Sequence, residues 1–122
     1  MAKNQGMGKA QKLLLEYRST VWRKNLLEKI PGIGETALQA CLEQIRFTRE
    51  LVLSLRNNKL LGEKFYWIIN ASYLSDRQPG DVNEILSNIA EQYEYIPRRT
   101  FFRLRTKAIE RLDNQMKSVE YR

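Results

Sequence analysis

Five basic side chains and no acidic ones lie within eleven residues near the end of the chain, in the segment PRRTFFRLRTK (97–107). Arginine and lysine bind phosphate groups, and the planar guanidinium of arginine can also donate two hydrogen bonds to the edge of a guanine base. Two adjacent phenylalanines, Phe101 and Phe102, lie in the middle of the segment. The composition therefore predicts a helix with one buried face and one face that binds a polyanion.

Helical spacing separates the two kinds of side chain in this segment. At about 100° per residue, one face is apolar and is formed by Phe101, Leu104, Ala108, Leu112 and Met116. The opposite face is formed by Arg99, Arg103 and Thr106, with Phe102 and Lys107 at its edges. We expect the apolar face to dock the helix on the rest of the domain and the basic face to point outward.

The residues before this helix predict a second, shorter one. Asp81 and Glu84 have the spacing of a reciprocal N-terminal cap, and an apolar run follows them. Pro97 suits the first turn of the next helix, where its missing N–H is not needed. Two helices with a short connection and a basic second helix are typical of a helix-turn-helix, whose second helix enters the major groove of DNA. The sequence thus predicts a recognition helix over residues 97–117.

Each residue of the basic face has an expected role. Arg99 and Arg103 are expected at base edges, because the first turns of a recognition helix lie deepest in the groove. Arg98, Thr100 and Lys107 are expected at phosphates. The complete predicted DNA-binding set is Arg98, Arg99, Thr100, Phe102, Arg103, Thr106 and Lys107.

No enzyme activity is predicted. The chain has no histidine and one cysteine, Cys41, which excludes a His-based triad and a zinc site built from Cys and His. Cys41 lies on an apolar helical face, so we expect a buried and inert thiol. Asp76, Asp81 and Glu84 could suggest a carboxylate metal site, but the helix cap accounts for two of them. We therefore expect no catalytic residue, no metal and no cofactor.

The remaining elements are expected to be helical, which makes the fold class all-α with about five helices. The other helices are predicted from residue 9 to 30, from 35 to 56, from 60 to 74 and from 81 onward, since no segment alternates with period two. The expected organisation is an N-terminal helical hairpin, residues 1–58, for oligomerisation or partner contact. A helix-turn-helix region, residues 59–122, follows it.

Net charge and composition agree with an anionic partner. The chain of 122 residues has a net charge of +7, with +5 in residues 1–26, −3 in residues 27–96 and +5 in residues 97–122. The positive charge is therefore concentrated at the two ends of the sequence, which favours nucleic acid over other partners. The sequence shows no secretory signal. Its apolar runs are much shorter than the roughly 20 residues that a membrane span needs, so a cytoplasmic location without membrane contact is expected.

The C-terminal half of the chain also resembles a known family. The stretch KFYWIINASYLSDRQPGDVNEILSNIAEQYEYIPRRTFFRLRTKAIERLDNQM, roughly residues 60–117, is similar to ArpU/RinA-type phage transcriptional regulators, which resemble the promoter-recognising domain of bacterial sigma factors. The resemblance implies a regulator of late phage genes in a bacterial host. It places Arg99, Thr100 and Arg103 on the recognition helix and Lys107 near the DNA backbone. One departure is a turn one residue longer than usual and without glycine.

Two other functions remain open. The first is a phage DNA-packaging protein similar to a small terminase subunit, and the second is a helical protein-binding module without DNA affinity. Expected partners are double-stranded DNA first, then RNA polymerase, and a homodimer is a candidate assembly. The homodimer hypothesis rests on an apolar surplus in the hairpin, where LLL (13–15) is followed by Val21 and Trp22.

Two further signals have simpler explanations. The segment KIPGIGETALQA resembles a helix-hairpin-helix that binds DNA phosphate through backbone N–H groups, but we favour a plain turn between helices. Trp22 and Trp67 could stack on single-stranded bases, but at helical spacing we expect them in the core.

Overall fold

The computed structural model describes residues 8–30, 32 and 34–120, and within these ranges the chain is helical and contains no strand. This confirms the predicted all-α fold of about five helices. The elements in chain order are α2 (Lys9–Glu28), α3 (Glu35–Leu53), a 3-10 turn η1 (Ser54–Asn57), α4 (Gly62–Ile69), a π-helical turn η2 (Asn70–Leu74), α5 (Val82–Gln92) and α6 (Arg98–Glu120).

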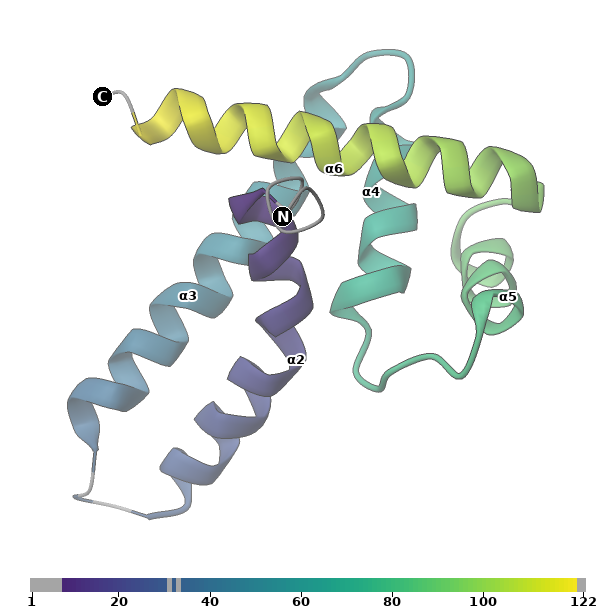
Figure 1. Cartoon of the computed structure of the whole chain (residues 1–122). Coiled ribbons are helices and arrows are strands. Elements are labelled where there is room, and N and C mark those ends of the chain that lie inside the picture. The colour runs from purple at the N-terminus through teal and green to yellow at the C-terminus, as the bar shows by residue number, and fades with distance from the viewer. Residues whose placement is uncertain (1–7, 31, 33, 121–122) are drawn as a thin grey trace, which may run out of the picture.

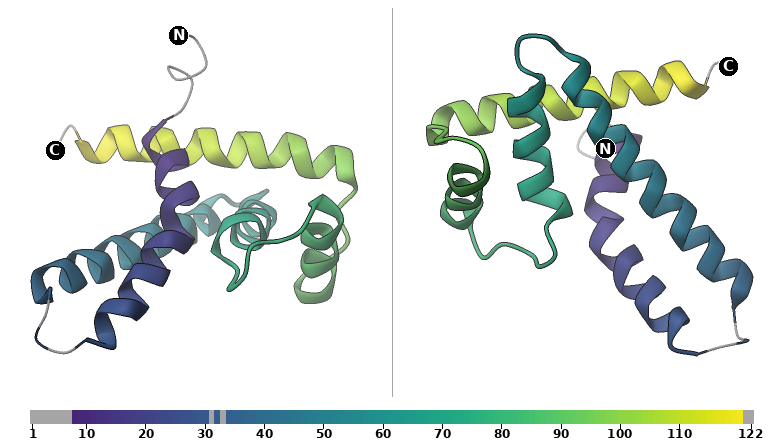
Figure 2. Two further views of the ribbon diagram at one scale, coloured as in Figure 1. Left: turned by 60° about the horizontal axis from the view of Figure 1, so that its bottom comes forward. Right: turned by 180° about the vertical axis from the view of Figure 1, so that it is seen from behind.

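The long helix α6 lies across one end of the molecule (Figure 1). The α2–α3 hairpin extends away from its C-terminal half, and α4 and α5 lie on the same side as the hairpin, with α5 near the N-terminal end of α6. Figure 2 shows this arrangement from two further directions. The first two turns of α6 therefore have α5 and α4 on one side and no helix on the other.

A single apolar core joins these helices. In α6 the predicted apolar face is buried, with Phe101, Ala108 and Leu112 at 0% exposure and Leu104 at 2%. Residues from both halves of the chain share this core, with members from α2, α3, α4, α5 and α6. Burying a leucine or phenylalanine side chain stabilises the fold by about 1.5–3 kcal/mol. The predicted apolar face of α6 is confirmed as buried. These contacts fix the orientation of α6 on the domain.

The N-terminus of α2 is capped by a residue of α6. Gly8 is the N-cap residue and has no side chain to offer, while Oδ1 of Asp113 accepts a hydrogen bond from the N–H of Ala10 at 2.9 Å. A Cβ atom at Gly8 would collide with the Asp113 carboxylate, so a larger residue here would displace that side chain and its hydrogen bond. This contact connects the beginning and the end of the described chain.

Arg18 connects the hairpin to the segment after α4. Its Nε donates to the carbonyl of Ser75 at 3.1 Å, and its Nη2 donates to Oγ of Ser75 at 2.8 Å and to the carbonyl of Ser72 at 3.3 Å. Burial lowers the pKa of the Arg18 guanidinium, and the neighbouring Tyr17 acts in the opposite direction. The two halves of the molecule are thus held together by directed polar contacts as well as by the core.

Several boundary predictions differ from the structure. The expected third helix divides into α4 and the π-helical η2, and the second ends as the 3-10 turn η1. The first helix, predicted to run to residue 30, ends as α2 at Glu28.

The prediction for Trp22 is wrong. We expected a core residue, and its side chain is 64% exposed, whereas Trp67 packs partly buried against the core. The reason is the geometry of the hairpin: its distal part extends beyond α4–α6, so one face of α2 has no helix to cover it (Figure 1). Cys41 is buried as expected. Within the described ranges, no helix has both the length and the apolar content needed to cross a lipid bilayer.

Candidate nucleic-acid interface

The short helix α5 begins at the predicted cap. Oδ1 of Asp81 accepts from the N–H of Glu84 at 3.0 Å, which confirms half of the expected reciprocal arrangement. The carboxylate of Glu84 reaches one residue further back than expected, where it accepts from the N–H of Gly80 at 3.0 Å and from Arg77 at 2.9 Å. The start of α5 is therefore fixed by side chains from both directions.

The connection between α5 and α6 is held at two points. The side chain of Ile96 is 1% exposed, and the ring of Tyr93 stacks on that of Trp67 with centroids 6.3 Å apart. No non-glycine residue in the described chain has a positive φ, and Tyr93, the C-cap of α5, has a φ of −140°. The chain therefore changes direction between α5 and α6 without a left-handed residue, and the turn needs no glycine.

The predicted DNA-binding residues come together on the first three turns of α6. Arg99, Arg103 and Thr106 are exposed on the side away from the core, and Arg98 and Lys107 are exposed at its two edges. Phe102 is 37% exposed and Thr100 is half-buried. We call this surface the basic face and define it by Arg98, Arg99, Thr100, Phe102, Arg103, Thr106 and Lys107.

The edge of the basic face nearest α5 is an ordered stack of side chains. Nη1 of Arg98 donates to Oδ1 of Asn83 in α5 at 3.1 Å, and its Cζ lies 5.7 Å from the centroid of the Phe102 ring. Arg105 lies 5.3 Å from the same ring and equally far from that of Phe101. Each such cation–π contact is worth about 0.5–1 kcal/mol at an exposed site. These contacts orient the guanidinium groups of Arg98 and Arg105 in the absence of a ligand.

Arg105 was not among the predicted site residues. It is half-buried, and its place in the stack follows from its position three and four residues after the phenylalanines, a spacing at which side chains meet on a helix. That spacing was visible in the sequence. Asn83 was missed too, and no local pattern could have indicated it, because it lies in the preceding helix.

The other edge of the basic face adjoins the loop before α4. Lys107 lines a shallow depression of about 360 Å³ together with Asn58, Leu61 and Phe65. The side chain of Asn58 accepts from the N–H groups of Leu60 and Leu61, which shapes this loop. Lys107 therefore lies at the margin of the basic face, next to this loop.

Charge on the basic face is not neutralised from within. In the described parts of the chain, no ion pair involves any of the basic side chains from Arg98 to Lys107. The first acidic residue on the outward side of α6 is Glu110, which is exposed and ends the basic stretch. Oγ1 of Thr106 donates to the carbonyl of Phe102 at 3.1 Å, so its lone pairs remain available as acceptors. The arrangement can bind phosphates and the acceptor edges of bases.

The IPGIGE turn between α2 and α3 lies only partly within the structure. Pro31 and Ile33 fall outside the described residues, while Gly32 and Gly34 have φ angles of +81° and +71°. Positive φ explains the glycines as turn residues.

Comparisons of the chain with protein-family models, curated protein sequences and solved structures found no match.

Proposed function

We propose that the protein is a sequence-specific DNA-binding transcription regulator of phage or prophage origin, which places α6 in the major groove. The observation that supports this most is the exposure of Arg99 and Arg103 without ion-pair partners on the first turns of a helix whose opposite side is buried in the core. A solvated surface helix gains little from such a concentration of like charge, whereas a DNA-binding helix releases counterions from the phosphates.

The residues divide into two groups in this proposal. Arg99 and Arg103 are spaced four residues apart and would contact neighbouring base edges, where each guanidinium can bind O6 and N7 of guanine. Arg98, Thr100 and Lys107, at the edges of the basic face, would contact phosphates and fix the register. Thr106 would accept from a base amine, and Phe102 holds Arg98 in place through their stacking contact.

The resemblance to ArpU/RinA-type regulators supports activation of late phage genes in the cytoplasm of a bacterial host. RNA polymerase is then a natural second partner, and a homodimer would match a palindromic operator. A packaging protein similar to a small terminase would instead form a ring-shaped oligomer, which light scattering on the purified protein distinguishes from a monomer or dimer.

Duplex binding as a function of salt tests the proposal. Four or five phosphate contacts give a slope of log K against log salt of about −4. Fluorescence anisotropy with a labelled random-sequence duplex, from low to moderate salt, measures this slope. No binding at low salt, or an affinity independent of salt, contradicts the proposal and leaves a protein-binding module as the alternative.

A further inference from the structure

The loop between η1 and α4, residues 58–61, projects past α6. It includes Leu60, whose side chain is 92% exposed, and Lys59, which is also exposed. In Figure 1 this loop rises beyond α6 on the side opposite to α4, α5 and the α2–α3 hairpin, and the right-hand view of Figure 2 shows the same from behind. We call it the η1–α4 loop. Because the basic face also points away from the core, the loop and the basic face lie on the same side of the molecule.

Local hydrogen bonds hold the η1–α4 loop in one shape. Oδ1 of Asn58 accepts from the N–H groups of Leu60 and Leu61 at 3.1 and 2.8 Å, and the carbonyl of Asn58 accepts from the N–H of Gly62 at 3.0 Å. A Cβ atom at Gly62 would lie 2.7 Å from the carbonyl oxygen of Leu55, so a larger residue would force α4 away from η1. The exposed Leu60 therefore belongs to an ordered loop, and binding through such a loop costs little conformational entropy.

Lys107 connects the η1–α4 loop to the basic face. Its side chain lines the same depression as Asn58 and Leu61, and Glu110 and Arg111, whose charges balance, line it one turn further along α6. Segments that pack against a helix lie about 8–10 Å from its axis, whereas the walls of the major groove, about 12 Å wide, lie about 6 Å from a helix centred in it. With α6 in the major groove, the loop would therefore lie over the sugar-phosphate backbone at one wall and reach the minor groove behind it.

The charge of this region suits a phosphate backbone. The segment from residue 54 to residue 62 has two basic residues, Arg56 and Lys59, and no acidic one. Glu63, which follows the segment, is paired with Arg56 at 2.9 Å. Within the described ranges, no ion pair involves Lys59. The positive charge of Lys59 therefore extends the basic face toward the loop.

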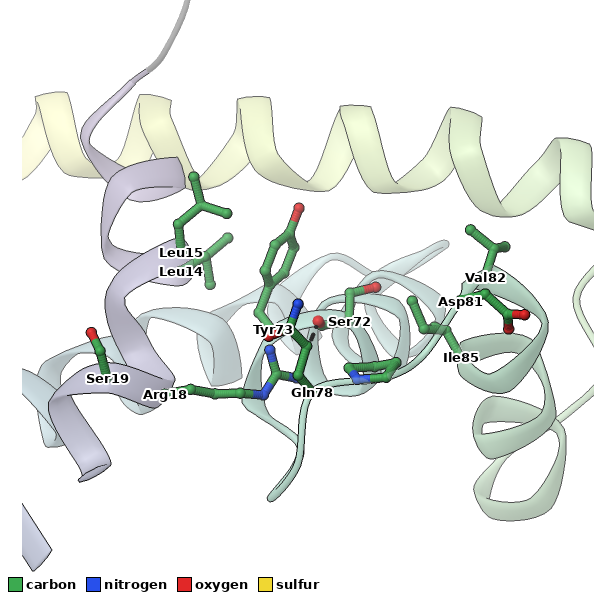
Figure 3. A pocket seen from close by; sticks show the side chains of 11 residues that line it. Leu14, Leu15, Arg18, Ser19, Ser72, Tyr73, Gln78, Asp81, Val82 and Ile85 are labelled. Atoms are coloured by element: carbon green, nitrogen blue, oxygen red, sulfur yellow. Dashed lines mark hydrogen bonds between the residues drawn. The ribbon is translucent and has the colours of Figure 1, made fainter.

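The surroundings of Leu60 favour nucleic acid over protein as its partner. Its neighbours in the loop are the polar Asn58 and Lys59 and the half-buried Leu61, so Leu60 is not the centre of an apolar patch of the kind that binds protein. A groove of about 440 Å³ with apolar walls lies elsewhere, between α2 and the segment from η2 to α5, on the hairpin side of α6 (Figure 3). A single apolar side chain among lysine and asparagine suits the minor groove, where polar residues contact base acceptors and a leucine can enter between base steps.

We propose that the η1–α4 loop is a second DNA-binding element, with Lys59 at a phosphate and Leu60 in the minor groove next to the major-groove site of α6. This inference rests on the proposed DNA binding by the basic face and adds a contact with flanking base pairs. An apolar side chain inserted into the minor groove kinks the duplex, and a kink is least costly at flexible steps such as TA and CA. The loop would thereby give a preference for such steps outside the bases that Arg99 and Arg103 contact.

Titrations and hydroxyl-radical footprinting with the full-length protein test the proposal. The probe is a duplex selected from a random pool by the unaltered protein, long enough to extend beyond the α6 site on both sides. Leu60→Ala is matched by Leu42→Ala, at an exposed leucine of α3 in the hairpin, and Lys59→Ala is matched by Lys29→Ala at the end of α2. Circular dichroism confirms that each variant is folded.

We expect Leu60→Ala to weaken binding to the selected duplex about tenfold, because an apolar contact is lost, and to leave the slope of log K against log salt unchanged, because no charge is lost. Lys59→Ala should reduce the magnitude of that slope by about 1. Both variants should lose protection of the flanking minor groove and keep the rest of the footprint. Leu42→Ala and Lys29→Ala should leave affinity, slope and footprint unchanged.

Three results overturn the proposal. The first is an unchanged affinity and footprint in the Leu60→Ala and Lys59→Ala variants, which leaves Leu60 to a protein partner; the proposed function then stands if Arg103→Ala still loses the preference for the selected duplex. The second is equal weakening by Leu60→Ala and Leu42→Ala, or weakening by Leu60→Ala without loss of the flanking protection. The third is the absence of duplex binding by the unaltered protein at low salt, which overturns the proposed function as well.

Discussion

Replacing Asp113 with alanine should loosen α2, although the residue lies in α6. Its Oδ1 bonds to the N–H of Ala10 at 2.9 Å, and the N-cap residue Gly8 makes no side-chain cap of its own. Asp113 therefore supplies both the acceptor and the negative charge that a helix N-terminus needs. Without it, the N–H of Ala10 in the first turn of this helix of 20 residues loses its side-chain acceptor.

The magnitude follows from the two contributions. Losing an N-cap acceptor costs about 0.5–2 kcal/mol, and losing the charge at the helix dipole costs about 0.3–1 kcal/mol. Alanine is a better helix former than aspartate by about 0.6 kcal/mol, which offsets part of this within α6. We expect a net loss of about 1–2 kcal/mol in the free energy of unfolding. With a urea m-value of about 2 kcal/mol/M, the midpoint falls by about 0.5–1 M.

Urea unfolding followed by circular dichroism measures this loss, and amide exchange locates it. The N–H of Ala10 should exchange faster in the Asp113→Ala variant, while the N–H groups in the middle of α6 should change little. Asp113→Asn keeps an acceptor and should lose about half as much stability. Asp76→Ala is the control, because Asp76 is exposed and should change stability by less than about 0.5 kcal/mol. Unchanged stability and unchanged exchange at Ala10 in the Asp113→Ala variant would refute the reasoning.

Two further substitutions test the contacts that hold α5 and α6 in place. Phe101→Ala should destabilise the fold by about 3–5 kcal/mol in urea unfolding, since the ring is 0% exposed; a loss below about 1 kcal/mol would contradict its burial. Asp81→Ala should cost about 0.5–2 kcal/mol by removing the cap of α5, with Asp76→Ala again as the reference. Equal thermal midpoints for the two aspartate variants would exclude a capping role for Asp81.

Local sequence patterns predicted the helices and the orientation of α6 because that information is contained within one helix. Apolar residues recur with the helical period from Phe101 to Leu112, so they lie on one side of the helix. Burying that side is energetically favourable. The cap at Asp81 could be predicted for the same reason, since donor and acceptor lie three residues apart.

Interactions between distant segments could not be predicted in this way. The bond from Ala10 to Asp113 joins residues 103 positions apart, and that from Arg98 to Asn83 crosses from one helix to the next. Trp22 was misassigned for a related reason: helical spacing groups it with other apolar residues but does not say which faces of a helix receive a neighbour. The exposure of Trp22 depends on which helices lie beside α2, which is a property of the whole fold.

DNA binding by the basic face is tested most directly by one substitution and its matched control. Arg103→Ala removes a guanidinium from the centre of the face, and Arg46→Ala removes one from the exposed surface of α3, with the same change in net charge. Both variants are titrated against a duplex selected from a random pool by the unaltered protein, and against an unselected duplex, with circular dichroism confirming the fold.

Arg103→Ala should weaken binding to the selected duplex by about 1–3 kcal/mol and should reduce the preference over the unselected one. Arg46→Ala should leave that preference unchanged. Equal effects of the two substitutions, or full retention of the preference by a folded Arg103→Ala variant, would contradict the assignment of α6 as the helix that reads DNA sequence.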